Sequence, residues 1–433
     1  MLSATRERMR RLGRPVRLLM ISEVLTVFSL LVGHLAVSWW VAEQGGAAHL
    51  AIYGVVMSAT AFVSMPLLSP LADRYPKRTL LGAGLSVFVL ETLLLASMVQ
   101  WLEYALLPLV LLEMVAVMAL AVMQPAAMSI AAELVPHEQL AEAFALQKSA
   151  QALGRMLGPA LCGLILATAG VLAALWLHVA LFVVAAWAAF RIPTGSHRAP
   201  SEARHWAREL TAGLRAKWVI PVERYWTILS FFTMLFFGPA IGLLVPLRVQ
   251  SLGWSAAWLG WCEAALSAGM LIGALYAARA LTERFGRYPI AITALAGEGV
   301  ALGLVGILDA RYALPLCFFF TGLCLACMQL IGQTHRMLAV PDQFRGRFSA
   351  CNLMVMHMAG TLGPALVGIL LLQAEVDLVY LICGLGMLLC ALCYPWLPGF
   401  RAFLSLDHAT AKDWYAREYP QAFAGEAGQA KAG

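Results

Sequence analysis

Long apolar runs follow one another along almost the whole chain, separated by short breaks rich in charged residues, glycine and proline. Each run is long enough to cross the hydrocarbon core of a bilayer as a helix, which takes about 20 apolar residues. The pattern therefore predicts an all-α integral membrane protein with 12 transmembrane helices. We expect these spans at residues 17–42, 49–72, 79–100, 105–131, 143–169, 171–190, 225–250, 256–281, 288–309, 312–337, 346–372 and 376–398.

The composition agrees with this class of protein. Of the 433 residues, 61% are hydrophobic and 12% are charged, whereas a soluble globular chain is about half apolar and about a quarter charged. This excludes a soluble enzyme, a secreted disulfide-rich protein, a disordered chain and a nucleic-acid-binding domain. The first apolar run is too long for a signal peptide, so we expect it to remain as the first span.

All nine cysteines lie within apolar runs. Cys324 and Cys327, like Cys390 and Cys393, have the CxxC spacing of metal or redox pairs. No further pair of Cys or His stands in register with them, so we interpret them as small residues at which helices pack closely. We expect no metal site and no cofactor.

The basic residues predict how the chain lies in the membrane, because Lys and Arg concentrate in cytoplasmic loops. The breaks on one side, together with both termini, hold 26 of them, whereas the other side holds only Arg248 and Arg311. Both termini are therefore predicted to be cytoplasmic. Aromatic residues cluster at the predicted outer ends of the spans, as an interfacial belt requires; they are Trp39, Trp40, Trp101, Tyr104, Trp254, Trp258 and Tyr312. Those at the predicted inner ends are Tyr225, Trp226, Tyr394 and Trp396.

The longest polar break divides the spans into two groups of six. Within this break, Trp206, Leu210, Leu214 and Trp218 recur every four residues, which predicts a helix lying on the cytoplasmic membrane surface. The predicted organisation is a basic tail over 1–16, a six-helix bundle over 17–190, a linker over 191–224, a second six-helix bundle over 225–398 and a cytoplasmic tail over 399–433.

The two halves repeat each other about 205 residues apart. Residues 157–166 match residues 362–371 at seven of ten positions, and both segments begin Leu-Gly-Pro-Ala-Leu. The charged break at 71–78 has a weaker echo at 281–287. Both breaks are predicted to be cytoplasmic, so the repeat is parallel and predicts two bundles that point the same way.

The break after the second span reads Ser69-Pro-Leu-Ala-Asp-Arg-Tyr-Pro-Lys-Arg78. It resembles the signature of the major facilitator superfamily between its second and third spans, with Ser69 and Pro76 at the two glycine positions. Together with the twelve spans and the parallel repeat, this resemblance implies a bacterial inner-membrane transporter. Its substrate site would lie at the midplane between the two bundles, and transport would proceed by alternating access.

An acid at a helix end beside basic residues can form charge-assisted bonds in one gate state and lose them in the other. We therefore expect the signature break and its echo to form a cytoplasmic gating motif. Its residues are Asp73, Arg74, Lys77 and Arg78, with Glu283, Arg284 and Arg287 in the second half.

A glycine-rich stretch in the fifth span, with Gly154, Gly158 and Pro159, resembles the antiporter motif of drug:proton exporters and predicts a helix bend. Gly363 and Pro364 repeat it in the second half, which favours packing within the repeat over an export-specific role. The fourth span lacks the arginine common in proton-coupled exporters. With this arginine missing, and with the paired Gly-Pro motifs and the segment from Pro125 to Glu133-Leu-Val-Pro136, the chain resembles the enterobactin-exporter and macrolide-efflux branch.

Ionisable residues inside spans are costly and mark functional sites. Glu113 in the fourth span and Arg155 in the fifth are predicted to meet near the midplane. Two interpretations remain open: Glu113 carries a coupling proton with Arg155 as its partner, or the two form a permanent buried pair. Glu23, paired with Lys148 or snorkelling to the interface, is a further candidate. His34 and Glu263 complete the cavity candidates.

Glu91 and Glu298 lie at equivalent mid-span places in the two halves and receive no predicted role. The sequence as a whole predicts a monomeric secondary exporter that uses protons to move a small molecule, such as a siderophore or a macrolide-like drug. A lysophospholipid or other lipid flippase, or an uptake carrier of the same fold, is the alternative. No enzyme is expected, because the loops lack a cluster of His, Asp, Asn or Cys, and no glycine loop for ATP is present.

Overall fold

The structure is a computed structural model that describes the chain except for residues 1–12, 69–70, 72–74, 136–139, 194–205 and 424–433. It also leaves out the side chains of some helical residues, among them Lys148 and Arg155. The part of the chain that it describes contains helices and no strands.

Ten helices in the described part are long and apolar enough to cross a membrane. The two longest elements hold two spans each: α2 (Gly13–Leu68) turns at Gly46, with φ 65°, and α6 (Leu140–Phe190) turns at Gly170, with φ 79°. Glycine adopts these positive φ values because it has no Cβ. With α2 and α6 each counted as two spans, the prediction of twelve spans is confirmed.

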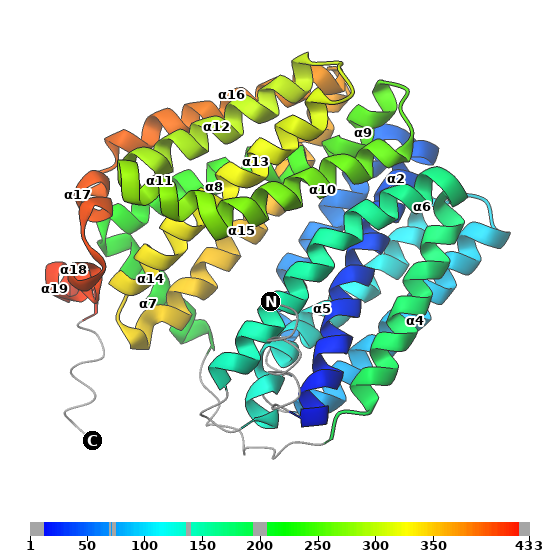
Figure 1. Cartoon of the computed structure of the whole chain (residues 1–433), viewed down its shortest axis with the longest axis horizontal. Coiled ribbons are helices and arrows are strands. Elements are labelled where there is room, and N and C mark those ends of the chain that lie inside the picture. The colour runs from blue at the N-terminus through cyan, green and yellow to red at the C-terminus, as the bar shows by residue number, and fades with distance from the viewer. Residues whose placement is uncertain (1–12, 69–70, 72–74, 136–139, 194–205, 424–433) are drawn as a thin grey trace. The chain divides into compact units, whose positions relative to one another are not determined.

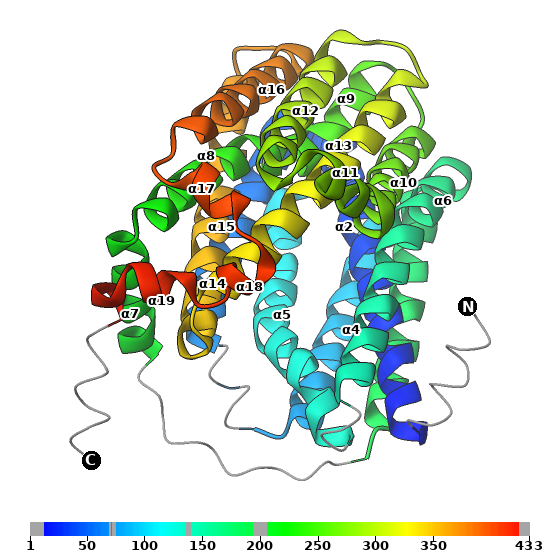
Figure 2. The same cartoon turned by 60° about the vertical axis from the view of Figure 1, so that its left-hand side comes forward.

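The chain divides into two compact units, of which the first comprises residues 1–201 and 249–264. Besides α2 and α6 it contains α4 (Lys77–Trp101) and α5 (Leu106–Leu134). α2 packs against α5 and α6, and α4 packs against the same two helices; the four lie side by side in Figures 1 and 2. The core of this unit includes Phe88 and Phe182, whose rings stack with centroids 4.8 Å apart.

The second unit comprises residues 202–248 and 265–433. Here α12 packs along both α13 and α16, while α8 packs against α15 and α16 (Figure 2). The helices from residue 206 to residue 393, some of which continue into the first unit, are α7 (Trp206–Val219), α8 (Pro221–Gly242), α9 (Leu244–Ser251), α10 (Ala256–Ile272), α11 (Ala278–Phe285), α12 (Arg287–Ile307), α13 (Ala313–Leu330), α14 (Arg336–Ala339), α15 (Asp342–Leu371) and α16 (Val376–Cys393). Two π-helical turns, Gly273–Ala277 and Ile331–His335, connect α10 to α11 and α13 to α14.

The tail after the last span is helical and packed. It forms α17 (Phe400–Ser405), α18 (His408–Ala411) and α19 (Trp414–Glu418), which are flanked by 3₁₀ turns at Tyr394–Trp396 and Pro420–Ala422. Phe400, Phe403 and Tyr415 are fully buried. Trp226 and Tyr394 are also buried, and Trp226 meets the ring of Phe400 edge-on at 5.0 Å. These two aromatic residues therefore pack against the tail.

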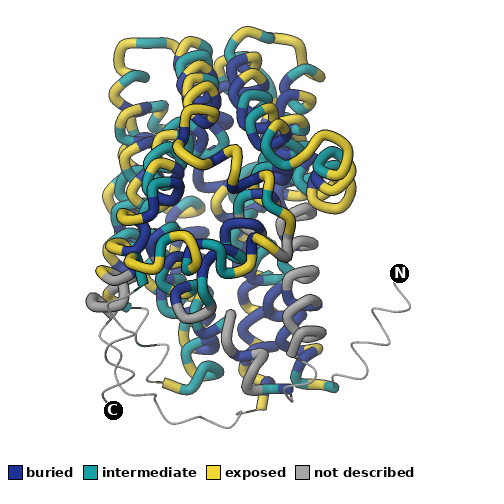
Figure 3. The backbone as a smooth tube through the Cα atoms, turned by 90° about the vertical axis from the view of Figure 1, so that its left-hand side faces the viewer, coloured by how far each residue is buried: buried dark blue, intermediate teal, exposed yellow. Residues whose placement is uncertain are grey.

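Many exposed side chains in both units are large and apolar. Buried and exposed residues alternate along the helices (Figure 3). Large apolar side chains on a surface are unfavourable in contact with water, but they are favourable in contact with lipid tails. Such exposed side chains include Leu94, Val184, Trp187, Leu271, Ile307 and Leu389.

Candidate functional site

The gating motif falls partly outside the described residues, because Asp73 and Arg74 are among those left out. Lys77 begins α4, and Arg78 donates a hydrogen bond of 2.7 Å to the carbonyl oxygen of Phe190. Phe190 is the last residue of α6, where backbone carbonyls lack helical partners and attract a cation. Arg78 therefore links the beginning of the third span to the end of the sixth.

The echo of the gating motif gives each of its residues a different partner. Glu283 forms an ion pair of 2.8 Å with Arg279 on its own helix. The Arg284 guanidinium lies 5.3 Å from the centre of the Phe285 ring, and Arg287 donates to the carbonyl oxygen of Leu406 at 2.7 Å. The three predicted residues are therefore not joined to one another, and Arg287 holds the tail.

The helix-bend motif makes equivalent contacts in the two units. A Cβ added at Gly154 would lie 3.0 Å from the Val24 carbonyl oxygen on α2, and one at Gly363 would lie 2.7 Å from that of Leu235 on α8. Gly158 is equally close to α2, and Pro159 and Pro364 follow inside the two helices. The motif thus brings the fifth span against the first and the eleventh against the seventh, which favours a packing role.

Glu23 is a buried residue of α2 that is 6% exposed. Its two carboxylate oxygens accept hydrogen bonds from the side-chain amides of Gln147, at 3.1 Å, and Gln151, at 3.0 Å. A carboxylate held in this way does not snorkel to the interface, so that interpretation is wrong for Glu23. The proposed partner, Lys148, has a side chain outside the described set.

Glu113 is half-buried on α5 and accepts a hydrogen bond of 3.2 Å from the hydroxyl of Tyr53 on α2. Sequence reasoning did not identify Tyr53, since nothing in the pattern of apolar residues singles it out. The Arg155 side chain lies outside the described set, so its pairing with Glu113 stays a prediction. Of the other cavity candidates, His34 is exposed on α2 and Glu263 is half-buried on α10.

Glu91 and Glu298 are buried at matching places, on α4 in the first unit and on α12 in the second, and are 4% and 2% exposed. Within the described structure, one carboxyl oxygen of each, Oε1, has no hydrogen-bond partner. Their surroundings differ. Glu91 lies within electrostatic range of Glu113, whereas Glu298 lies within range of the thiols of Cys324 and Cys327.

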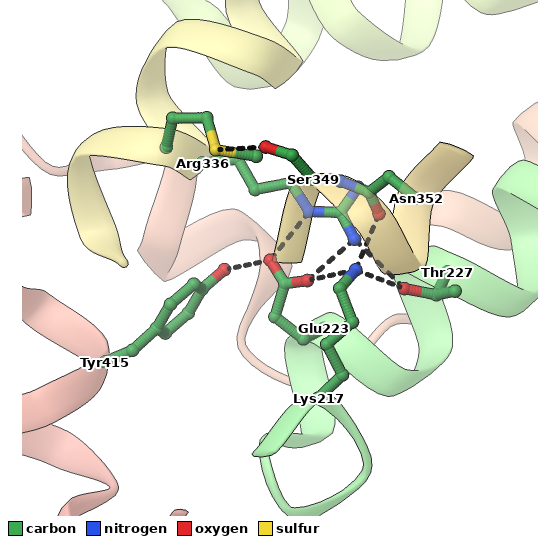
Figure 4. Close-up of polar contacts among 8 residues, drawn as sticks. Lys217, Glu223, Thr227, Arg336, Ser349, Asn352 and Tyr415 are labelled. Carbon is green, nitrogen blue, oxygen red and sulfur yellow. Dashed lines mark hydrogen bonds and ion pairs between the residues drawn. The ribbon is translucent and has the colours of Figure 1, made fainter. Parts of the chain in front are cut away.

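A cluster of buried charged residues in the second unit was not predicted (Figure 4). At its centre, Glu223 at the start of α8 is fully buried. Arg336 of α14 donates to both of its carboxylate oxygens at 2.7 Å, in the two-pronged geometry that makes such pairs strong. These contacts join the beginning of the seventh span to the segment that follows the tenth.

Two further residues bring the linker helix and the tail into this charged cluster. Lys217 of α7 lies 3.1 Å from Glu223 and donates to Asn352 of α15 at 2.6 Å, and the hydroxyl of Tyr415 of α19 donates to Glu223 at 2.8 Å. Burial, reinforced by repulsion from Arg336, lowers the pKa of Lys217 to about 8, although Glu223 acts in the opposite direction. Burial and the nearby Glu223 carboxylate raise the pKa of Tyr415 well above its usual value, so its hydroxyl remains a donor.

Comparison with known proteins identifies relatives among membrane transporters. The profile of the Major Facilitator Superfamily matches residues 19–278 and 228–406. The enterobactin exporter EntS of Shigella boydii is 27% identical over 315 residues, which cover 71% of this chain and 73% of EntS. The multidrug efflux pump Tap of Mycolicibacterium fortuitum is 27% identical over 253 residues, 58% of this chain, and the match spans about three fifths (61%) of Tap.

Solved structures of transporters have the same fold. A bacterial homologue of the iron transporter ferroportin, in its inward-facing state, superposes with a TM-score of 0.71 over 91% of this chain and 99% of its own, at 14% identity. The nucleoside transporter NupG gives a TM-score of 0.68 over 91% of this chain and 100% of its own, at 13% identity. At such low identity these structures show the fold alone. Since the family profile spans almost all of the membrane helices, this multi-pass membrane protein belongs to the Major Facilitator Superfamily.

Proposed function

We propose that this protein exports a small organic molecule from the bacterial cytoplasm across the inner membrane, by alternating access driven by the proton gradient. The observation that carries the proposal is the similarity to two efflux proteins, EntS over 71% of the chain and Tap over 58%. A siderophore or a hydrophobic drug such as a macrolide is the proposed class of substrate. We also propose that the protein works as a monomer with both termini in the cytoplasm.

Glu113 is the proposed proton carrier. It lies inside a span, where an ionisable group is costly unless it has a function, and it accepts a hydrogen bond from a neutral hydroxyl, that of Tyr53. In this proposal Arg155 approaches Glu113 in one state of the transport cycle. Asp73, Arg74, Lys77 and Arg78 close the cytoplasmic gate in the other state, with Glu283, Arg284 and Arg287 acting in the second unit.

The test uses inside-out membrane vesicles of a bacterium that expresses the protein, energised to an acidic interior. Labelled iron-free enterobactin and a labelled macrolide are the two probes. We expect at least one of them to accumulate in the vesicles, and a protonophore or Glu113→Gln to abolish accumulation while the protein level stays unchanged. Accumulation that survives both treatments would overturn proton coupling.

The alternative function, movement of a lipid or uptake of a solute, gives a different result in the same vesicles. A lipid flippase would move a fluorescent lysophospholipid between leaflets and leave both soluble probes outside. An uptake carrier would concentrate its probe in right-side-out vesicles instead. Either result, with no accumulation in the inside-out vesicles, would replace the exporter proposal.

A further inference from the structure

We propose that Glu91 and Glu113 form one proton-binding site, a carboxyl pair that holds a single shared proton inside the first unit. The assignment of this proton to transport rests on the proposed function. Sequence reasoning gave Glu91 no role and gave Glu113 a basic partner. The structure instead places a tyrosine hydroxyl in contact with Glu113 and a second acid, Glu91, within its electrostatic range.

The two acids lie on consecutive helices at similar depth. Glu91 is ten residues before the end of α4, and Glu113 is seven residues after the start of α5. At 1.5 Å of rise per residue, the two lie about 15 Å and about 11 Å from the short loop that joins these helices. Because α4 packs along α5, both side chains are well inside the hydrocarbon layer, which is about 30 Å thick.

The two carboxyl groups have unequal hydrogen-bond partners. Glu113 accepts from the Tyr53 hydroxyl at 3.2 Å, whereas Oε1 of Glu91, which is 4% exposed, has no hydrogen-bond partner within the described structure. Glu91 is within electrostatic range of both Glu113 and Tyr53. A carboxylate without donors is much less stable in an apolar interior than a neutral acid, so Glu91 is the natural holder of the proton.

Two negative charges at this place would repel each other strongly, because the apolar surroundings screen them weakly. Neighbouring carboxylates in such sites titrate as a pair, and one of them keeps its proton. Tyr53 of α2 interacts with both acids. His178 of α6 is another titratable residue of this unit, and its Nδ1 lies in a hydrogen bond of 2.8 Å with the hydroxyl of Ser29 on α2. Lys148 and Arg155 of α6 have side chains outside the described set.

The chain provides a matched control in Glu298. This residue occupies the equivalent position in the second half, is equally buried and has an equally unpartnered Oε1. Its titratable neighbours are the thiols of Cys324 and Cys327, and among the described residues no carboxylate is found to interact with it. Glu298→Gln therefore removes a single buried acid of the same kind without touching the pair.

The test is infrared difference spectroscopy of the full-length protein in lipid nanodiscs, following the C=O stretch of protonated carboxyl groups as the pH is changed. We expect Glu91→Gln to remove one band. We expect Glu113→Gln to keep that band but to shift its titration midpoint by about one pH unit or more, because the repelling neighbour is gone. Glu298→Gln should leave the midpoint unchanged.

A midpoint that does not move in Glu113→Gln would overturn the shared site. If Glu91→Gln does not fold, Tyr53→Phe provides the same information, because loss of the hydroxyl donor must also shift the band. The spectroscopic measurement does not depend on whether the protein transports a substrate. Accumulation in vesicles that ignores a protonophore, together with a coupled band, would therefore reject the proposed function while supporting the pair.

Discussion

Glu223 is surrounded by more positive charge than it can neutralise. Lys217 and Arg336, both less than a tenth exposed, share this one carboxylate, and the hydroxyl of Tyr415 adds a neutral donor. Removing charges from water is costly, and the cost is offset only when geometry and hydrogen bonds are good. In this cluster Glu223, Lys217 and Arg336 all have close partners. The excess positive charge falls on Lys217, because lysine loses its proton more readily than arginine.

The stability of the protein should therefore depend on the protonation of Lys217. Its pKa is lowered to about 8 in the folded state, against about 10.4 for a free lysine. Between these pH values the unfolded chain binds more protons than the folded one, so stability rises as the pH rises from about 8 to about 10.4. The expected gain is about 3 kcal/mol.

Thermal unfolding in detergent at several pH values measures this gain. Lys217→Met keeps the length of the side chain but cannot titrate, so its unfolding temperature should lack the rise that the native protein shows over this range. Lys412, in the exposed part of the tail, supplies the control: Lys412→Met should retain the rise. Parallel pH profiles for the native protein and Lys217→Met would contradict the prediction.

At the level of single residues, the sequence showed which residues have unusual chemistry, such as an acid inside a span, but it did not show which residues they contact. Glu113 was recognised because a charge within an apolar run stands out. Its contact with Tyr53, 60 residues away in sequence, depends on how two helices are rotated about their axes, and uniformly apolar spans give little indication of that rotation. The same limit explains why the two glutamines that hold Glu23 inside the unit were not predicted.

At the level of the elements, glycine determines how closely helices approach. Gly363 on α15 packs directly on the backbone of α8 near Leu235. Gly360, one turn earlier on the same helix, has nothing within 4 Å of an added Cβ. The two glycines therefore differ in packing while sharing the same helical backbone.

We expect opposite effects from one substitution at these two positions. Gly363→Ala should destabilise the protein by about 1–3 kcal/mol, because the new methyl group meets a backbone carbonyl that cannot move aside. Gly360→Ala should be neutral or stabilising by up to about 1 kcal/mol, since alanine favours the helix. Unfolding temperatures of the purified variants compare the two, and equal values would show that the close contact has no effect.

The spans themselves could be predicted from the sequence. The third span was expected at 79–100 and is helical over Lys77–Trp101, and the twelfth was expected at 376–398 and is helical over Val376–Cys393. The tail helices were missed because each is too short to show a period. The feature that could have indicated them is the aromatic content of the tail. Phe400, Phe403 and Tyr415 are fully buried, and a tail surrounded by water would have no need of such residues.

At the level of the whole molecule, the distribution of basic residues makes a prediction about topology that fusion proteins can test. Of the 30 Lys and Arg residues, all but a few fall in breaks on the same side of the predicted membrane. A green fluorescent protein fused after Gly433 should therefore fluoresce, because it folds in the cytoplasm and not in the periplasm.

Alkaline phosphatase provides the opposite readout, since it is active only after export. Fused after Gly433 it should be inactive, and fused in the break between α12 and α13, near Arg311, it should be active. An active phosphatase at Gly433 would invert the predicted topology and would move the Glu223 cluster to the outer side.

The anchoring of α7 also shortens the stretch of chain that joins α6 to the second unit. A 34-residue linker was expected between the bundles, at residues 191–224, but α7 is held to its own unit by Lys217 and begins at Trp206. The stretch of chain between the end of α6 at Phe190 and the start of α7 at Trp206 is thus about 15 residues long. Fully extended, it would span about 50 Å. Closing a loop of about 15 residues costs less conformational entropy than closing one of 34.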